Sequence, residues 1–259
     1  MCYDIQMMLE NQLRTAKLRG DAHAAQEIME RLLEFTDLPI YHATGFSHPE
    51  VLIYTDRSPQ FPEVATWGLV PPWVRDEDQL KKTWNSTLNA RGETIFEKNS
   101  FRSAAKNSRC LLYIDGFYEH HHFGKDTYPF FIHRKDGEPM ILAGLYSDWE
   151  NPETGGKMTT FSIVTTSGNS MMAKIHNNPK LEIGPRMPVI LPEELADKWL
   201  LEYHDELDKQ SLDELMTAYP EEEMAAHPVR KIRGKNGVGN VEEASQPFHY
   251  PELPDLNVA

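Results

Sequence analysis

The stretch that decides the fold is Cys110-Leu111-Leu112-Tyr113-Ile114-Asp115-Gly116-Phe117-Tyr118, residues 110–118. It is a short apolar and aromatic run with an Asp-Gly pair, which is typical of a buried strand near a turn. Similar short runs precede and follow this stretch in the sequence. Further short β-rich runs, separated by Gly, Pro, Asn and Asp, occupy residues 39–44, 51–55, 64–70, 128–133, 140–148, 158–166 and 187–191.

Helical patterns lie outside and between these runs. Residues 4–35 carry apolar side chains at three- and four-residue spacings, with an interruption at Gly20-Asp21, where Asp21 can cap a second helix. Asn169 or Ser167 can cap a helix over residues 169–175. Other short helices fit residues 101–106, 193–203 and 211–218.

These elements predict one α+β domain, because strands dominate and do not alternate with helices as βαβ units would. We expect a strand-rich, curved or barrel-like mixed sheet with peripheral helices. The domain spans residues 1–240 and includes an N-terminal helical insertion at about 5–35. Residues 241–259 contain three prolines and are expected to form an extended tail.

Composition sets limits on function. A hydrophobic content of 40% in 259 residues supports a packed core, and no apolar run approaches the ~20 residues of a membrane span. The N-terminus lacks a signal-peptide pattern, and two cysteines make no disulfide framework, so we expect a cytoplasmic protein. Nothing indicates an obligate assembly, so a monomer is expected.

The net charge of −14 argues at first against a nucleic-acid partner. The acidic residues are unevenly placed, however, since residues 193–223 hold twelve of them against two lysines. Basic clusters remain at Lys98–Arg109 and Arg230–Lys235. The net charge therefore does not exclude a local basic groove, although charge alone does not show one.

Cys2 directly follows the initiator methionine. Removal of Met1 would leave an α-amine and a thiol on adjacent carbons, a pair that condenses with an aldehyde to a five-membered thiazolidine. The amine titrates near ~7.7–8.0 and the thiol near ~8.5, so either becomes nucleophilic at neutral pH after a modest shift. The alternative is that a small second residue occurs by chance.

Several other positions carry possible chemistry, each with a structural alternative. Asn89 can orient a substrate oxygen and Arg91 can hold a phosphate, or the two can belong to a turn and a surface. Glu119, just after Asp115-Gly116, can transfer protons, or be an exposed carboxylate. His176 at a helix C-terminus is expected to have a raised pKa.

Arginine and tryptophan residues supply possible contacts to nucleic acid. Arg186 opens a buried strand and is a second candidate phosphate anchor. Trp67 and Trp73 are either core residues or platforms for bases, and we expect both to contact DNA. The adjacent His120-His121-His122 point to alternate faces of an extended strand, so they do not share one ion, and neither a metal nor another cofactor is expected.

Taken together, several segments resemble the SRAP family of SOS-response-associated peptidases, or abasic-site-processing proteins. The match covers about residues 1–4 and 39–240. The segments, in order, are Met1-Cys2, Trp67-Gly68-Leu69-Val70-Pro71 with Trp73, Asn89-Ala90-Arg91-Gly92-Glu93-Thr94, Ser100-Phe101-Arg102, Arg109-Cys110-Leu111, Asp115-Gly116-Phe117-Tyr118-Glu119, Leu142-Ala143-Gly144-Leu145-Tyr146, Ile175-His176 and Arg186-Met187-Pro188-Val189-Ile190-Leu191.

The resemblance implies a DNA-damage protein that binds single-stranded DNA at abasic sites and forms a thiazolidine crosslink through Cys2. It implies autoproteolytic removal of Met1, a hydrolase activity, together with release of the crosslink, a lyase-type step. In the roles carried over, Cys2 is the nucleophile, Asn89 orients the sugar or amine, and Glu119 moves protons. His176 assists sugar ring opening, and the two arginines, Arg91 and Arg186, hold the flanking phosphates.

The sequence departs from the family pattern at several places. Tyr3-Asp4 follows Cys2 where the family usually has Gly-Arg, and an acidic side chain there is expected to repel phosphate and raise the amine pKa. His120 replaces a common tryptophan, and residues 177–185 separate His176 from Arg186. Two alternatives follow: a Cys2-dependent peptidase or amidohydrolase, and a non-catalytic module that binds single-stranded DNA.

Overall fold

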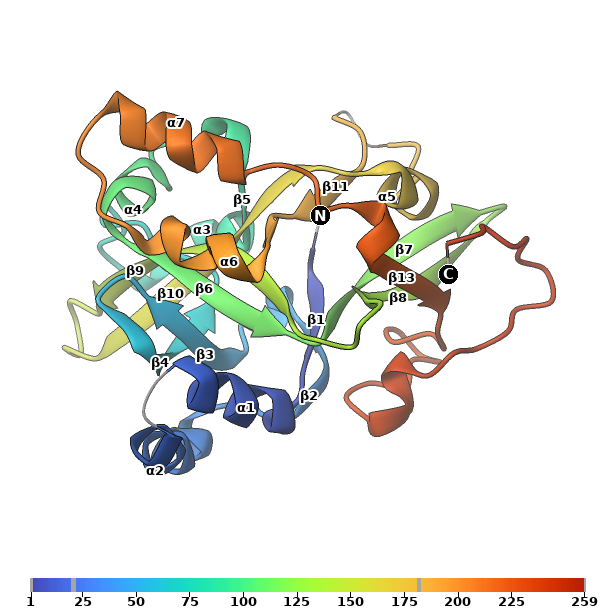
Figure 1. The fold of residues 1–259 in the computed structure, drawn as a ribbon, viewed down its shortest axis with the longest axis horizontal. Helices are drawn as coiled ribbons and strands as arrows, with labels where there is room; N and C mark the ends of the chain where they lie inside the picture. The colour runs from blue at the N-terminus through green and yellow to red at the C-terminus, as the bar shows by residue number, and fades with distance from the viewer. Residues whose placement is uncertain (1, 20–21, 181–182, 259) are drawn as a thin grey trace.

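The computed structural model describes residues 2–19, 22–180 and 183–258, and it is built on two sheets with helices around them (Figure 1). The Gly20-Asp21 break, with its capping residue, lies outside the described residues. The strands are β1 (Asp4–Met7), β2 (Ile40–Thr44), β3 (Glu50–Thr55), β4 (Ser58–Trp67), β5 (Asn89–Arg91), β6 (Arg109–Ile114), β7 (Gly116–Phe123), β8 (Asp126–Arg134), β9 (Met140–Glu150), β10 (Lys157–Ser167), β11 (Arg186–Pro188), β12 (Ile190–Leu191) and β13 (Met224–Pro228). The α-helices are α1 (Leu9–Arg19), α2 (Ala22–Leu32), α3 (Glu77–Thr83), α4 (Arg102–Asn107), α5 (Ser170–Ile175), α6 (Glu193–Ala196) and α7 (Glu206–Leu215).

The larger sheet closes into a barrel. Its strands follow the order β10-β4-β3-β6-β9, and β9 pairs back onto β10, which completes the ring. Phe161 of β10 lies opposite Trp67 of β4 on one side and Tyr146 of β9 on the other. The expected α+β fold with a barrel-like mixed sheet is thus confirmed.

The second sheet has the order β13-β8-β7-β1-β2, so β1 is an internal strand. Ile5 lies opposite Phe117 of β7 and Ala43 of β2. The expectation that residues 4–35 are helical from their start is therefore wrong at Asp4–Met7. Pairing on both edges with strands from elsewhere in the chain outweighs the local helical spacing.

The deciding stretch 110–118 forms two strands in two sheets. β6 belongs to the barrel and β7 to the second sheet, with the change of direction at Asp115. Gly116 permits this crossing, because a Cβ there would lie 2.4 Å from Cζ of Phe131 and 2.5 Å from the carbonyl oxygen of Ile132. Any other residue would push β7 away from β8.

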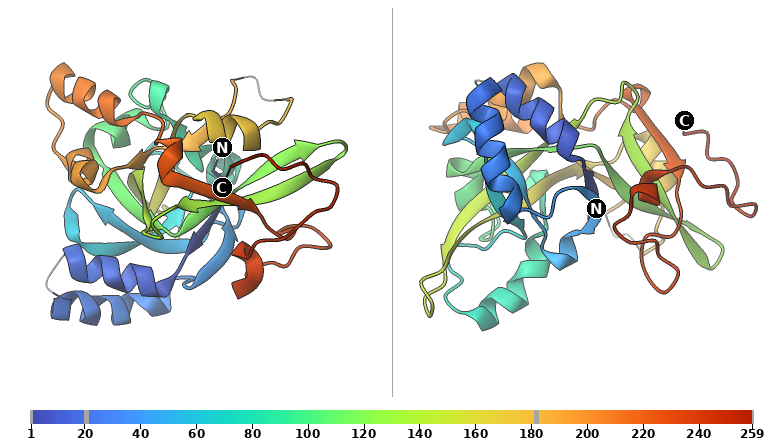
Figure 2. Two further views of the ribbon diagram at one scale, coloured as in Figure 1. Left: turned by 45° about the vertical axis from the view of Figure 1, so that its right-hand side comes forward. Right: turned by 90° about the horizontal axis from the view of Figure 1, so that it is seen from below.

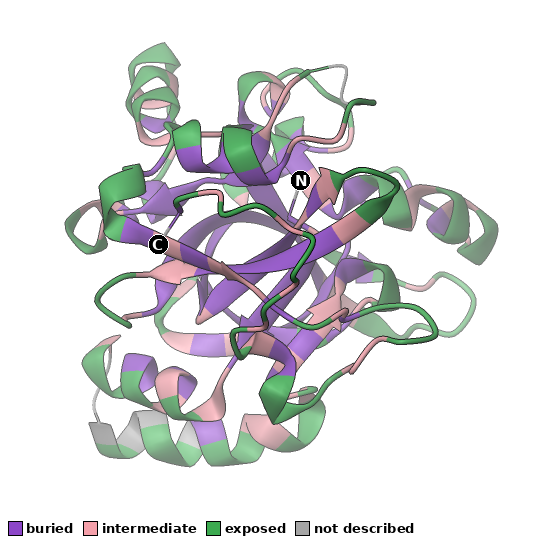
Figure 3. Ribbon diagram, turned by 90° about the vertical axis from the view of Figure 1, so that its right-hand side faces the viewer, coloured by how far each residue is buried: buried purple, intermediate pink, exposed green. Residues whose placement is uncertain are grey.

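Alternate residues of β6 serve two cores, as the strand geometry requires. Cys110, Leu112 and Ile114 point into the main core, which also contains Cys2. Leu111 and Tyr113 pack in a second cluster, with Trp199, beneath the peripheral helices. Figure 3 shows the buried strands at the centre and the exposed faces of helices outside them.

Some peripheral elements differ from their sequence expectations. Residues 193–203 form α6 followed by a 3-10 turn, Asp197–Leu200, and α7 begins earlier than residue 211. The side chain of Asp205 accepts the N–H groups of Leu207 and Asp208 and so starts α7 there. β5 and β13 were not expected as strands.

The C-terminal segment 241–258 runs along β13 (Figure 2). It is extended apart from a 3-10 turn, Glu242–Ser245. The Ala226 N–H donates to the carbonyl of Val258 at 3.1 Å, and the Tyr250 hydroxyl donates to Val229 at 2.9 Å. Among the described helices, none has the length and apolar character needed to cross a membrane.

An Asn169→Ala substitution is expected to lower the free energy of unfolding by about 1–2 kcal/mol. Asn169 caps α5 as expected, since its Oδ1 accepts the Met172 N–H at 2.9 Å, and its Nδ2 donates to Tyr219 at 2.8 Å. Urea denaturation measures the loss. The matched control is Ser167→Ala, because Ser167 is exposed and does not cap the helix. Equal stabilities of the two variants would contradict the capping role.

Candidate active site around Cys2

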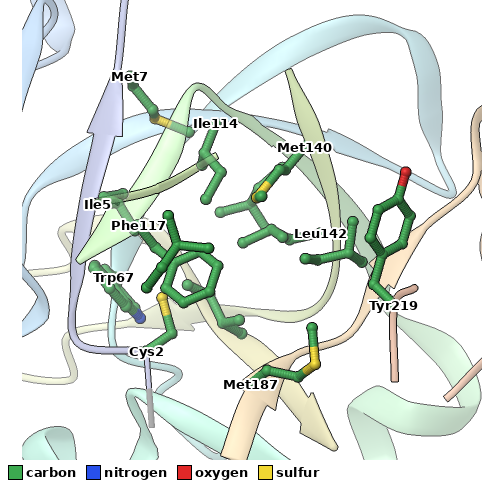
Figure 4. Close-up of a cluster of buried hydrophobic side chains, with 14 of the residues drawn as sticks. Cys2, Ile5, Met7, Trp67, Ile114, Phe117, Met140, Leu142, Met187 and Tyr219 are labelled. Carbon is green, nitrogen blue, oxygen red and sulfur yellow. The ribbon is translucent and has the colours of Figure 1, made fainter. Parts of the chain in front are cut away.

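Cys2 lies just before β1 and is 1% exposed. Figure 4 shows its side chain in the cluster that holds Trp67, Phe117 and Met187. Burial raises the pKa of the Cys2 thiol, and the carboxylate of Glu119 raises it further. The thiol is therefore protonated at neutral pH, so any reaction as a thiolate would need a nearby proton acceptor.

Asn89 reaches Cys2 from β5, the short strand that runs parallel to β10. Its Nδ2 donates a hydrogen bond of 2.8 Å to the main-chain carbonyl of Cys2. Its Oδ1 is buried and has no hydrogen-bond partner among the described residues. Buried polar atoms in proteins are normally hydrogen-bonded, so this oxygen can accept a hydrogen bond from an N–H or O–H group of a bound molecule, such as an amine or a hydroxyl.

Glu119 and His176, the two candidate acid–base residues, lie close together. Glu119 stands on β7 and His176 ends α5, and their Oε2 and Nδ1 atoms lie 3.5 Å apart. The expected rise in the His176 pKa at a helix end is wrong, because burial lowers the pKa despite the opposing effect of Glu119. His176 is therefore a neutral imidazole at pH 7 and can accept a proton.

The insertion before Arg186 does not separate it from His176. Main-chain N and O atoms of Arg186 both lie 3.2 Å from Nδ1 of His176. The Arg186 side chain is buried and binds the Glu93 carboxylate through two hydrogen bonds, of 2.6 and 2.9 Å. This pairing lowers the pKa of Glu93. A phosphate at Arg186 has to share or replace the Glu93 carboxylate.

Arg91 differs from Arg186 in being exposed. Its guanidinium has no ion-pair or hydrogen-bond partner in the parts of the chain that the structure describes. It follows Asn89 on β5, so the same short strand carries a group that binds Cys2 and a cation open to solvent.

The two tryptophans lie in different surroundings. Trp67 is fully buried, its indole N–H donates to the Leu88 carbonyl at 2.8 Å, and its ring stacks against Phe161. The expectation that Trp67 contacts DNA is therefore wrong, because a ring packed in the core offers no face to a base. Trp73 is 44% exposed and keeps an accessible ring.

Asp4 has a role that the sequence did not reveal. Its Oδ1 accepts hydrogen bonds from Nε2 of His42 and from Nε of Arg233, each at 2.8 Å, and a further one from Nη2 of Arg233. Nη2 of Arg233 also donates to Thr44 at 2.7 Å. The negative charge of Asp4, two positions after Cys2, is thus balanced by a cation from the C-terminal basic cluster.

The three adjacent histidines alternate in burial along β7, with His121 buried and its two neighbours half-buried, as the strand alternation predicts. Nδ1 of the buried His121 lies 2.8 Å from the Lys174 carbonyl, while the main chain of His122 binds Asn177. Within residues 2–19, 22–180 and 183–258, no three His, Cys, Asp or Glu side chains gather as metal ligands would.

The fold is expected to lose stability as the pH falls below about 6.5. Burial lowers the pKa values of His120, His176 and His227, so the unfolded chain binds more protons than the folded one in this range. The stability that these neutral histidines contribute is fully present above the pKa of an unfolded histidine. It is lost as the pH falls through their lower pKa values in the folded protein. Urea midpoints at pH 7.5 and 5.5 measure it.

A histidine variant separates this effect from carboxylate titration. His227→Gln should flatten the pH dependence, whereas His249→Gln, at an exposed position, should leave it unchanged. A urea midpoint that stays constant between the two pH values would refute the prediction.

Comparison with known proteins matches residues 14–235 to the family described as SOS response associated peptidase (SRAP). The chain is 36% identical over 167 residues to abasic site processing protein YoqW of Bacillus subtilis (strain 168), covering 64% of this chain and 68% of that protein. It is 30% identical over 244 residues to abasic site processing protein HMCES of Gallus gallus, covering 84% and 69%.

Solved structures have the same fold. A protein from Bacteroides thetaiotaomicron superposes with a TM-score of 0.81 at 30% identity, over 96% of this chain and 100% of that one. A protein from Bordetella bronchiseptica gives a TM-score of 0.68 at 21% identity, over 88% and 100%, which concerns the fold alone.

Proposed function

Because this chain belongs to the SOS response associated peptidase (SRAP) family, we propose that it processes abasic sites in DNA through a covalent bond at Cys2. The names of its relatives, abasic site processing proteins, support the substrate. The resemblance seen in the sequence motifs led to the same family.

One observation carries the proposal: four groups from separate elements meet at the N-terminal end of β1. Asn89 holds the main chain of Cys2, the charge of Glu119 acts on the Cys2 thiol, and His176 lies 3.5 Å from Glu119. A 1,2-aminothiol with an amide, a carboxylate and a neutral imidazole matches the needs of aldehyde condensation, which moves several protons. Ordinary core packing does not require this polar set.

The chemistry consumes an aldehyde and an aminothiol and releases one water molecule. An abasic sugar is mostly a closed hemiacetal, so His176 takes the proton of the anomeric hydroxyl and returns it to the ring oxygen as the bond between that oxygen and the anomeric carbon breaks, which opens the aldehyde. The free amine of Cys2 adds to the carbonyl carbon, and loss of water gives an imine. The thiol then adds to the imine carbon while its proton passes to nitrogen, with Glu119 as the carrier.

DNA would be held by cations and one ring around this centre. Arg91 is the accessible phosphate contact, and Arg186 joins it where a phosphate replaces Glu93. Trp73 is the exposed ring available for a base. Single-stranded DNA is the expected partner, because a strand without its complement can bend a lesion into a buried site.

Intact mass spectrometry tests the proposal. Purified protein is expected to lack Met1, and after incubation with a single-stranded oligonucleotide carrying one abasic site, to gain the mass of that oligonucleotide less one water. An oligonucleotide with a stable tetrahydrofuran analogue, which has no aldehyde, is the control and should bind without an adduct.

Other results would select a different function. Binding to the abasic strand with no mass gain would favour a non-catalytic module for single-stranded DNA. Hydrolysis of peptides or amides without any DNA would favour a peptidase or amidohydrolase that uses Cys2. Either outcome in place of the adduct contradicts the proposal.

A further inference from the structure

We propose that Tyr3, Phe46 and Arg233 form a binding site for the nucleotide next to the abasic site, in which the rings stack on its base and the guanidinium binds its phosphate. This inference rests on the proposed function, because it places the nucleotide beside the sugar that reacts with Cys2. None of the three residues belongs to the motifs that identify the family in this sequence.

The two rings are held together next to Cys2. Tyr3 follows Cys2 directly, and its main-chain carbonyl accepts the Gly45 N–H at 2.8 Å, which fixes it against the 3-10 turn Gly45–Ser47. The ring centroids of Tyr3 and Phe46 lie 5.0 Å apart. Phe46 is 47% exposed, although a phenylalanine in a turn gains nothing from contact with water. An exposed ring beside a reactive group is a surface on which a base can stack.

Arg233 brings a cation to the same place. Asp4 holds its Nε and Nη2, and Thr44 holds Nη2 a second time, so the guanidinium is fixed rather than mobile. The Cζ atom lies 6.0 Å from the centre of the Phe46 ring. The side chain is 37% exposed, and Nη1 has no hydrogen-bond partner among the described residues. A preorganised guanidinium with a free N–H group suits a phosphate oxygen.

A second cation acts on the other ring. Arg91 opposes the rise that burial causes in the Tyr3 pKa, so its charge lies near the phenol. The aromatic pair therefore has Arg233 at Phe46 and the unpaired Arg91 at Tyr3. In a chain with a net charge of −14, the exposed Arg91 and the free N–H group of Arg233, beside the exposed Phe46 ring and the half-buried Tyr3 ring, favour an anionic, aromatic ligand. A nucleotide of the damaged strand has both properties and is delivered there by the lesion.

The main test removes the exposed ring. Phe46→Ala should weaken binding of a single strand containing a tetrahydrofuran site by about 5- to 150-fold, the range for one stacked base. Phe46→Trp should restore it. Phe123→Ala, at an exposed ring on the end of β7, is the matched control and should bind as the parent protein does. Thermal melting checks that each variant is folded.

A change in the DNA makes the test specific. Two further oligonucleotides lack the base of the nucleotide next to the tetrahydrofuran site, one on its 5′ side and the other on its 3′ side. One of the two should bind the parent protein more weakly than the original oligonucleotide does. Binding to Phe46→Ala should not weaken further with that oligonucleotide, because the stacking contact is already lost. Independent losses that simply add would overturn the proposal.

The cation is tested through salt dependence. Arg233→Gln should lower the slope of log affinity against log salt by about 0.7, the value for one phosphate on a single strand, while Arg230→Gln should leave it unchanged. Equal salt slopes for the two variants would show that Arg233 does not bind a phosphate. If the parent protein forms no adduct with abasic DNA, the proposed function fails. If the adduct forms normally and Phe46→Ala binds as tightly as the parent, only this inference fails.

Discussion

A Cys2→Ala variant is expected to form no stable adduct with abasic single-stranded DNA. Alanine is a small second residue, so Met1 can still be removed during translation without help from Cys2, which leaves an α-amine that can form the imine. It lacks the sulfur that closes the five-membered ring, and an imine hydrolyses when the protein is denatured. The adduct should therefore be absent from denaturing gels but appear after reduction with borohydride, which traps the imine.

The second cysteine provides the control for Cys2. Cys110 is fully buried on β6, and burial raises the pKa of its thiol well above the usual value. Cys110→Ala should therefore give as much adduct as the parent protein. A stable adduct with Cys2→Ala at the parent level, without borohydride, would show that the sulfur of Cys2 is not part of the product.

Glu119→Gln is expected to slow adduct formation by about 10²- to 10⁴-fold, the usual contribution of a positioned acid–base group. Glutamine has nearly the same shape and can still hydrogen-bond to the main-chain N–H of His120, which Glu119 binds at 3.0 Å. It cannot carry a proton between the amine, the carbonyl oxygen and the thiol. Single-turnover rates at saturating DNA measure the loss separately from binding.

A matched carboxylate controls for the change in charge. Glu150, at the end of β9, is exposed, and its pairing with Lys157 lies outside the site, so Glu150→Gln should react at the parent rate. A fall of less than about threefold for Glu119→Gln would exclude Glu119 from proton transfer. An unchanged rate combined with a shifted pH profile would instead assign it a role in positioning His176.

The sequence predicted the strands of the barrel, apart from the first part of β4 (Ser58–Trp67), because each predicted run is short and apolar with turn residues at its ends. It did not predict β1, because the spacing of Ile5 and Met8 fits one continuous helix. The same two residues also fit a strand that ends at Met7 and is followed by a helix from Leu9. Nor could it reveal that residues 110–118 divide between two sheets. That division depends on the close approach of Gly116 to Phe131, a contact made only in the folded chain.

The candidate site was predictable as a set of motifs but not as a set of contacts. Motif order brought together Cys2, Asn89 and Glu119. The ion pairs that decide the local charge join residues far apart in sequence, such as Arg233 and Asp4, which are 229 positions apart. The same limit applies to the pKa of His176, because its burial depends on the whole fold.

The position of β1 has a consequence for the order in which this protein matures. Its two neighbours, β2 and β7, are translated after it, and Asp4 pairs with Tyr118, more than a hundred residues later. Cys2 therefore leaves the ribosome long before the strands that hold it exist, and His176 follows later still. Contacts so distant in sequence form slowly during folding. Under the proposed function, the aminothiol acquires its acid–base partners only after about two thirds of the chain has been translated, so the protein would become reactive as a finished fold rather than as a nascent chain.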